Sequence, residues 1–291
     1  DPRRVYTGAS VGNSWQWQPH NEYHVKAGAR GLSWAGAQPE SESDYRARID
    51  TVKQPYVSHE TGQWCVFPNF NEIRKYTGVN KAKNFEIFRD ILNDNQMGSQ
   101  SHDFMMASGK LQALCYKHEI EKTLRTPDYA GFQLLALNDY SGQGTALVGV
   151  LDVFFEEKGY INAEQFRRFC SPTVPLARIP KFVYANNETF HADIEVSHFG
   201  AAPLQGAKTS YTIKDKFGKV YAKGTVGTQT IPIGNLCALG SVDMSLKGID
   251  TPQKLNLEVC IEGSDAVNDW DFWVYPCLLY TSPSPRDKRQ S

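Results

Sequence analysis

The pattern of apolar residues changes near residue 180, and this change limits the folds that the chain can adopt. Residues 1–180 contain short apolar runs separated by helical patterns, whereas residues 181–276 alternate apolar and polar side chains with a period of two. Strands that alternate with helices predict a parallel sheet, and about 95 residues of period-two strands predict a β-sandwich. We therefore expect an α/β domain over 1–180 and an all-β, immunoglobulin-like sandwich over 181–276.

The first part contains four candidate strands, which are residues 4–9, 22–25, 56–60 and 131–137. Pro55 precedes the third and Pro127 precedes the fourth, which favours strand starts there. Apolar residues at helical spacing predict helices over 84–95 and 101–126, between the third and fourth strands. Four strands alternating with helices amount to half of an eight-stranded barrel. We expect half of a TIM (β/α)8 barrel.

The second part shows clean alternation in two segments, Phe190–Val196 and Leu255–Ile261. Between them, Asp215-Lys216-Phe217-Gly218 has the composition of a hairpin turn. A proline-rich linker over residues 171–180 separates the two parts. These signals predict antiparallel strands that pack as a sandwich.

Composition excludes several classes of partner. Lys and Arg number 31 against 32 Asp and Glu, so a net charge of −1 argues against a nucleic-acid surface built on bulk charge. There is no apolar run long enough to span a membrane, and no apolar leader segment follows Asp1. The six cysteines are widely spaced without a C-x-x-C pair, which favours buried apolar roles. We expect neither a cofactor nor a nucleic-acid partner.

Glu60 is the best candidate for a catalytic residue. It closes the third predicted strand, and the carboxyl ends of barrel strands form the catalytic face. A carboxylate there, beside His59 and near Trp64, suits a nucleophile that attacks an anomeric carbon, with aromatic rings as a platform for the sugar. The alternative, of equal weight on spacing alone, is a surface glutamate paired with a neighbouring base.

Other polar and aromatic residues also follow predicted strands. Indole faces with amide and imidazole donors suit a pyranose, which has apolar C–H faces and hydroxyl edges. The predicted substrate-binding residues are Trp15, Trp17, His20, Asn21, His24, His59, Trp64, Asn138, Asp139 and Gln143.

Two apparent motifs fail on spacing. Residues 20–24 read H-x-E-x-H rather than the H-E-x-x-H of zinc proteases, so we expect no metal site. The glycines of residues 142–149 have neither the dinucleotide-binding interval nor a P-loop Gly-Lys. A metal-dependent hydrolase using His20, His24 and His59 is retained as a third hypothesis.

Four segments, residues 55–64, 69–78, 125–127 and 131–152, resemble bacterial glycoside hydrolase family 2 enzymes of the Bacteroidetes type, which include β-galactosidases and β-glucuronidases. The resemblance implies a retaining exo-β-glycosidase in which Glu60 is the nucleophile at the end of barrel strand seven. It also implies that the present strands are five to eight, so the expected half-barrel is the C-terminal half of a TIM (β/α)8 barrel. The acid/base glutamate and the N-terminal domains would then be absent, leaving an inactive fragment of a periplasmic or extracellular enzyme.

Glucuronidases of this family resemble one another in an Asn-x-Lys pair, which this chain lacks. The resemblance therefore favours a neutral sugar, with a β-galactoside first. The second hypothesis is a non-catalytic carbohydrate-binding protein in which Glu60 is incidental.

The peptide Cys277–Asp287 resembles a translated transposase sequencing adaptor. We expect residues 277–291 to be an artefactual, disordered tail.

Overall fold

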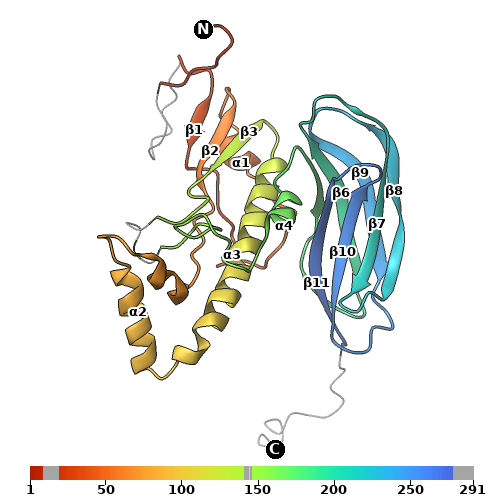
Figure 1. The fold of residues 1–291 in the computed structure, drawn as a ribbon. Helices are drawn as coiled ribbons and strands as arrows, with labels where there is room; N and C mark the ends of the chain where they lie inside the picture. Colours follow the sequence, from red (N-terminus) through yellow and green to blue (C-terminus); the bar gives the residue numbers. More distant parts are fainter. Residues whose placement is uncertain (9–19, 141–143, 145, 278–291) are drawn as a thin grey trace, which may run out of the picture.

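The computed structural model of this chain describes residues 1–8, 20–140, 144 and 146–277. Figure 1 shows a half that contains a small sheet and a long helix, and beside it a half made of strands. The elements of the first half are β1 (His24–Lys26), α1 (Arg46–Ile49), β2 (Tyr56–Thr61), η1 (Phe70–Lys75), α2 (Lys83–Asp94), η2 (Gly98–Gln100), α3 (Ser101–Leu124), β3 (Tyr129–Leu134) and α4 (Ala163–Arg167). Among the described residues, no helix is long and apolar enough to cross a lipid bilayer.

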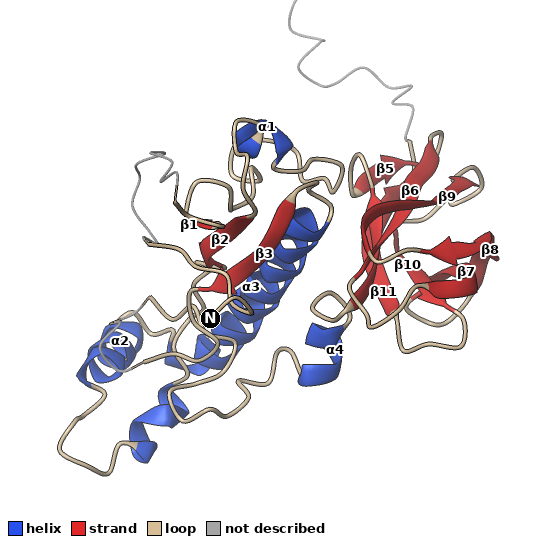
Figure 2. Ribbon diagram, turned by 90° about the horizontal axis from the view of Figure 1, so that it is seen from above, coloured by secondary structure: helices blue, strands red, loops and turns tan. Residues whose placement is uncertain are grey.

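The sheet of the first half has three parallel strands. Strand β2 is central and pairs with β1 on one side and β3 on the other. Helix α3 runs alongside this sheet (Figure 2). Its first part buries residues three or four apart, which are Met105, Gly109, Gln112, Cys115 and Tyr116, whereas residues 118–123 are all buried. Leu111 and Leu114 of the predicted apolar face are exposed. The predicted helices are thereby confirmed as α2 and α3.

The predicted half-barrel is wrong. The three-stranded sheet is open, and the described part of the first expected strand, residues 4–8, is not strand. Val5 and Tyr6 are exposed there, so no burial drives pairing. Only the four-residue α1 stands between β1 and β2, and β3 is followed by loop and isolated bridges before the short α4. The long helices that a barrel needs after β1 and β3 are therefore not formed.

The second half consists of two sheets. Its strands are β4 (Thr173–Arg178), β5 (Val183–Ala185), β6 (Thr189–His198), β7 (Leu204–Asp215), β8 (Val220–Ile231), β9 (Gly234–Ser245), β10 (Gln253–Ile261) and β11 (Val267–Tyr275). One sheet has the order β5-β11-β10-β7-β8 and the other β4-β6-β9. Phe190 of β6 stacks on Phe272 of β11 with ring centroids 4.0 Å apart, so the two sheets share one core.

The hairpin predicted at residues 215–218 is present. The Gly218 amide donates to the Asp215 carbonyl at 3.0 Å, and Gly218 has a φ of +84°. Strand β4 already belongs to a sandwich sheet, through its antiparallel pairing with β6. We retain the division into residues 1–180, 181–276 and 277–291 as a proposal. Residues 278–291 of the expected tail lie outside the described residues.

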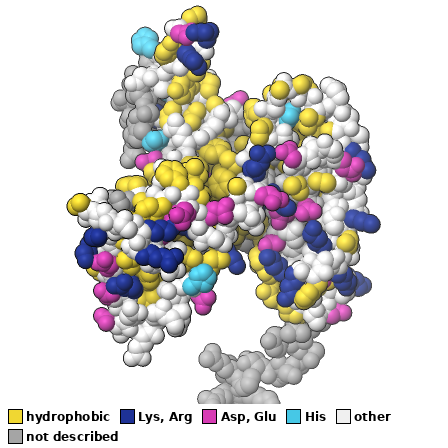
Figure 3. All heavy atoms as spheres, viewed as in Figure 1, with side chains coloured by type: hydrophobic (Ala, Val, Ile, Leu, Met, Phe, Trp, Pro, Cys, Tyr) yellow, Lys and Arg dark blue, Asp and Glu magenta, His cyan; other side chains and the backbone are white. Residues whose placement is uncertain are grey.

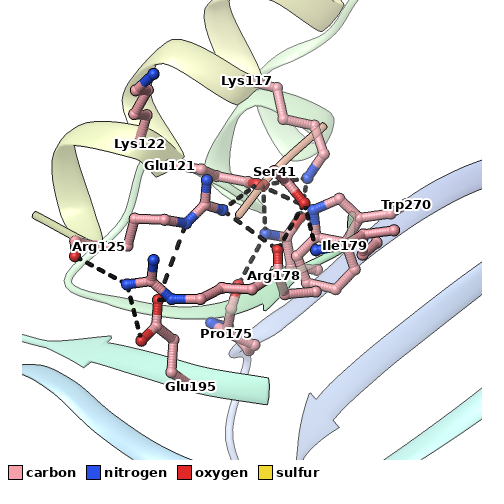
Figure 4. Close-up of polar contacts among 12 residues, drawn as sticks. Ser41, Lys117, Glu121, Lys122, Arg125, Pro175, Arg178, Ile179, Glu195 and Trp270 are labelled. Carbon is pink, nitrogen blue, oxygen red and sulfur yellow. Dashed lines mark hydrogen bonds and ion pairs between the residues drawn. The ribbon is translucent and has the colours of Figure 1, made fainter. Parts of the chain in front are cut away.

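A buried polar network joins α3 to the sandwich (Figure 4). The Glu121 carboxylate accepts hydrogen bonds from Trp270 Nε1 at 2.9 Å and Asn268 Nδ2 at 2.8 Å, both on β11. Lys117 of α3 and Arg125, the residue that follows α3, form ion pairs with the same carboxylate. Two of the four partners come from the first half and two from β11, so one buried charge links the two halves.

Candidate functional site

Glu60 lies near the end of β2, at the carboxyl edge of the parallel sheet. Its Oε2 accepts from Arg30 Nη1 and from Gln63 Nε2, each at 3.1 Å. The same guanidinium nitrogen donates to the carbonyls of His59 and Glu60 at 2.8 Å. The Glu60 side chain is 36% exposed. A carboxylate held by a cation and an amide, yet open to solvent, is suited to binding or nucleophilic chemistry.

The backbone at Glu60 is strained. Its φ of +56° lies in the left-handed region, which a glutamate rarely adopts. Gly62 follows with a φ of +84°, and a Cβ there would meet the Tyr116 ring at 1.9 Å. Helix α3, which carries Tyr116, therefore leaves room only for a glycine at position 62, two residues after Glu60. Such strain persists where the surroundings impose it, and it clusters at functional sites.

His59 lies beside Glu60 but is oriented by another strand. Its Nδ1 lies 3.0 Å from Oε1 of Gln133 on β3, and its Nε2 lies 3.9 Å from Glu60 Oε1. Because an amide oxygen only accepts, His59 Nδ1 carries the proton in this contact. The Gln133 contact thereby fixes the imidazole next to the Glu60 carboxylate.

Trp64 is connected to the same region through Glu119. Trp64 Nε1 donates to Glu119 Oε2 at 2.8 Å, and the Gly31 amide donates to Oε1 at 2.7 Å. Glu119 is buried, and burial raises its pKa above the ordinary value although both donors oppose the shift. Both of its oxygens are occupied, so Glu119 positions Trp64 and the Arg30-Gly31 loop rather than facing a substrate.

The predicted residues around β1 are largely enclosed. His24 is fully buried in β1, where burial lowers its pKa and Gln54 provides a side-chain hydrogen bond. Asn21 is buried, and its Oδ1 accepts from the Gly8 amide at 2.8 Å. His20 is exposed. Trp15, Trp17 and Gln143 lie outside the described residues.

The predicted residues after β3 form part of a structural cluster. Asp139 is fully buried, accepts from the Gly149 amide at 2.8 Å and pairs with Lys158 Nζ at 2.5 Å. The Asn138 amide donates to the Asp139 carbonyl at 2.8 Å. Buried charges held in this way stabilise a local fold, and these two residues pin the loop after β3.

Glu72 of η1 lies near the acidic side chains of Asp152 and Asp139 and has no hydrogen-bond partner of its own among the described residues. It is 1% exposed, and neither carboxyl oxygen has a hydrogen-bond partner among the described residues. Burial, followed by the negative charge of Asp152, raises its pKa to about 7. Glu72 therefore changes protonation near neutral pH.

The structure brings together Glu60, His59 and, through Glu119, Trp64. Sequence reasoning missed the residues that hold them, which are Arg30, Gln63, Glu119 and Gln133. Arg30 follows a predicted strand, so the rule that identified the other candidates applies to it as well. Glu119 could also have been found from the sequence. It is a charged residue four positions after the apolar Cys115, and therefore on the same side of the predicted helix, where a charge needs a partner.

No metal centre is indicated by geometry within residues 1–8, 20–140, 144 and 146–277, because no group of three or more His, Cys, Asp or Glu side chains there is arranged to hold an ion.

The fold and this site define the class of molecule as a small parallel α/β sheet joined to a β-sandwich. A model of a domain of unknown function, DUF8488, matches residues 188–276, within the sandwich. This match covers less than half of the chain. No curated protein matches the chain.

Solved structures with local similarity include two glycosidases. An exo-chitosanase from Amycolatopsis orientalis is 13% identical, with a TM-score of 0.35 over 58% of this chain and 19% of its own. The Bacteroides uniformis β-glucuronidase is 10% identical, with a TM-score of 0.28 over 88% of this chain and 26% of its own. A CARDB domain from Pyrococcus furiosus is 16% identical, with a TM-score of 0.26 over 36% of this chain and 91% of its own. The chain thus spans about a quarter or less of either enzyme, and scores this low carry no argument about its function.

Proposed function

We propose that this chain supplies the nucleophile of a retaining β-glycosidase site, with Glu60 as that nucleophile. The observation that carries the proposal is the Glu60 carboxylate itself, which is strained, solvent-accessible and held by Arg30 and Gln63 at 3.1 Å. A glycosidase nucleophile must be ionised and must keep one oxygen lone pair aimed at the anomeric carbon. Arg30 and Gln63 both bind Oε2, which leaves Oε1 for attack.

The reaction would proceed in two displacements. Glu60 Oε1 forms a bond to the anomeric carbon as the glycosidic bond breaks, and the leaving oxygen takes a proton from a general acid. Water then attacks the glycosyl-enzyme and releases Glu60. Glu119 cannot be that acid, because it is buried and both of its oxygens are already bonded. We therefore propose that the acid/base glutamate is not among these residues, and that the chain alone turns over ordinary glycosides poorly.

The charge around Glu60 indicates whether the sugar is neutral or acidic. Arg30 is the cation at the carboxylate and is already engaged with it, so a sugar carboxylate has no evident partner there. This supports a neutral sugar, and we propose a terminal β-galactoside. The second candidate function is carbohydrate binding without catalysis. It is favoured by Glu119, which contacts the same Arg30-Gly31 loop as Glu60 but has both carboxylate oxygens already occupied.

A mechanism-based label tests the nucleophile without needing the acid. A 2,4-dinitrophenyl 2-deoxy-2-fluoro-β-galactoside has a leaving group that departs unprotonated, and the fluorine slows hydrolysis of the intermediate. We expect one glycosyl adduct on the intact chain, mapped after trypsin digestion to Glu60 in the peptide of residues 54–74.

Glu60→Gln must abolish this label, while Glu22→Gln, which removes an exposed carboxylate, must keep it. Adduct formation at another residue, or an equal yield from Glu60→Gln, contradicts the nucleophile assignment. Reversible galactoside binding without any adduct supports the binding-only alternative.

A further inference from the structure

A large cleft lies away from Glu60, where α3 and the segment around α4 face the sandwich. Its volume is about 1070 Å³. Figure 3 shows a furrow between the two halves on this face, with charged side chains of both signs along it. The walls come from four places: residues 34–39, α3, residues 160–169, and residues 181–183 with 268–273 of the sandwich. A cleft of this volume accepts a ligand larger than one sugar ring.

Aromatic rings provide flat walls in this cleft. Trp34 and Trp273 both line it and are half-buried, so each keeps part of its surface open to a ligand. The Trp34 ring packs edge-on against His118 and Phe182, with centroids 4.8 Å and 6.3 Å away. These contacts fix the indole before any ligand arrives, which reduces the entropy lost on binding.

Most charged groups of the cleft are paired within the protein. Arg168 binds Asp269 at 2.9 Å, and Asp271 binds Lys254 at 2.6 Å. Lys117 is engaged with the buried Glu121. Lys110 and Glu164 also line the cleft without an ion pair among the described residues, and their charges are opposite. The cleft therefore carries no excess of either sign, which favours an uncharged ligand.

A buried imidazole adds a neutral polar group. His118 of α3 lines the cleft and is 4% exposed, and its Nδ1 has no hydrogen-bond partner among the described residues. Burial lowers its pKa to about 3, so the ring stays uncharged at physiological pH. A buried polar atom left unpaired costs stability, and a ligand hydroxyl is a chemical match for it.

We propose that this cleft binds a neutral oligosaccharide, separately from the Glu60 site. Fixed indole walls match the apolar faces of pyranose rings, and the uncharged His118 together with the amides of Gln38, Asn162 and Gln165 match their hydroxyls. The balance of charges in the cleft disfavours polyanions. The binding does not rest on Glu60 being a nucleophile.

Calorimetric titration of the full chain tests this. The probes are four neutral hexasaccharides, with β-1,4-linked galactose, glucose, mannose or xylose backbones, and hexagalacturonate as the acidic counterpart. We expect at least one neutral probe to bind with a dissociation constant below about 1 mM, and the acidic probe not to bind.

Two variants localise the binding. Trp273→Ala removes one wall, and Leu111→Asp puts a charge on the α3 wall at a side chain 58% exposed, where folding is unaffected. Each should weaken binding by about tenfold or more. Phe217→Ala, at an exposed ring outside the cleft lining, and Glu60→Gln should leave it unchanged.

The proposal is overturned if none of the four neutral probes binds, if hexagalacturonate binds as tightly, or if Leu111→Asp has no effect. If binding is lost in Glu60→Gln but kept in Trp273→Ala and Leu111→Asp, the saccharide binds at the Glu60 site, and the proposal is overturned as well. Failure of the fluoroglycoside label leaves this titration unaffected, so the two proposals fail separately.

Discussion

The indole nitrogen of Trp270 donates a hydrogen bond of 2.9 Å to the Glu121 carboxylate, and this contact joins the last sandwich strand to the longest helix of the other half. Both side chains are fully buried. Despite that burial, the charges of Lys117 and Arg125 lower the Glu121 pKa to about 2. Glu121 is therefore a buried carboxylate kept ionised by cations and N–H donors from both halves.

Glu121→Gln should destabilise the protein by about 3–5 kcal/mol, because it leaves the Lys117 and Arg125 charges buried without their partner. Denaturant unfolding measures this. The matched control is Glu262→Gln, which breaks an exposed pair with Lys208 at 3.0 Å and should cost less than about 1 kcal/mol. Equal losses in the two variants would contradict the structural role of Glu121.

Acid titration should separate Glu121 from other carboxylates. A carboxyl whose folded pKa is depressed contributes stability above its unfolded pKa of 4.5 and loses it as the pH falls through the folded value of about 2. The difference in unfolding free energy between wild type and Glu121→Gln should therefore shrink from pH 4.5 to pH 2. A constant difference over that range would exclude the ionised state.

Glu72 should show the opposite dependence. Its folded pKa of about 7 exceeds the unfolded 4.5, so the folded state holds the extra proton and stability is lost as the pH rises from 4.5 through 7. Glu72→Gln should then match wild type at pH 4 and exceed it by roughly 2–3 kcal/mol at pH 8. Thermal or urea unfolding of both proteins at both pH values measures this difference. Equal stability of wild type and Glu72→Gln at pH 8 would contradict the raised pKa of Glu72.

Arg30→Gln should slow fluoroglycoside labelling of Glu60 by about tenfold or more, because the charge-assisted bond at 3.1 Å no longer orients Oε2. The label is followed by intact-protein mass. Arg167→Gln removes an exposed pair with Asp265 and should label at the wild-type rate. An unchanged rate in Arg30→Gln, with native circular dichroism, would refute the positioning role.

Gly62→Ala tests how closely α3 approaches the backbone just after Glu60. Both Gly62 and Gly248 have a φ near +90°, but only at Gly62 would a Cβ collide, at 1.9 Å from the Tyr116 ring. Gly248→Ala should cost about 1–2 kcal/mol for the backbone alone, and Gly62→Ala clearly more. Similar unfolding midpoints for the two variants would show that the Tyr116 ring of α3 does not restrict the residue at position 62.

Local signals in the sequence predicted the strands β2 and β3, the helices α2 and α3, and the sandwich strands with the turn at Asp215. Each of these rests on spacing within a dozen residues. The half-barrel failed because strands that alternate with helices fit an open sheet as well as a closed one. Likewise, the sequence pointed to Glu60 and His59 but not to Gln133, which reaches them only through the pairing of β2 with β3.

By itself, then, the sequence determined where apolar faces form, because a period of two or 3.6 fixes which side chains share a surface. It also placed Glu60 at a strand end. Only the tertiary structure decided which charges are buried and which partners they meet. Glu119 and Glu121 are two residues apart on α3, yet one contacts Trp64 and the Arg30-Gly31 loop and the other contacts Trp270 of the sandwich. Residues two apart on a helix point to different sides, and what covers each side is set by packing rather than by local sequence.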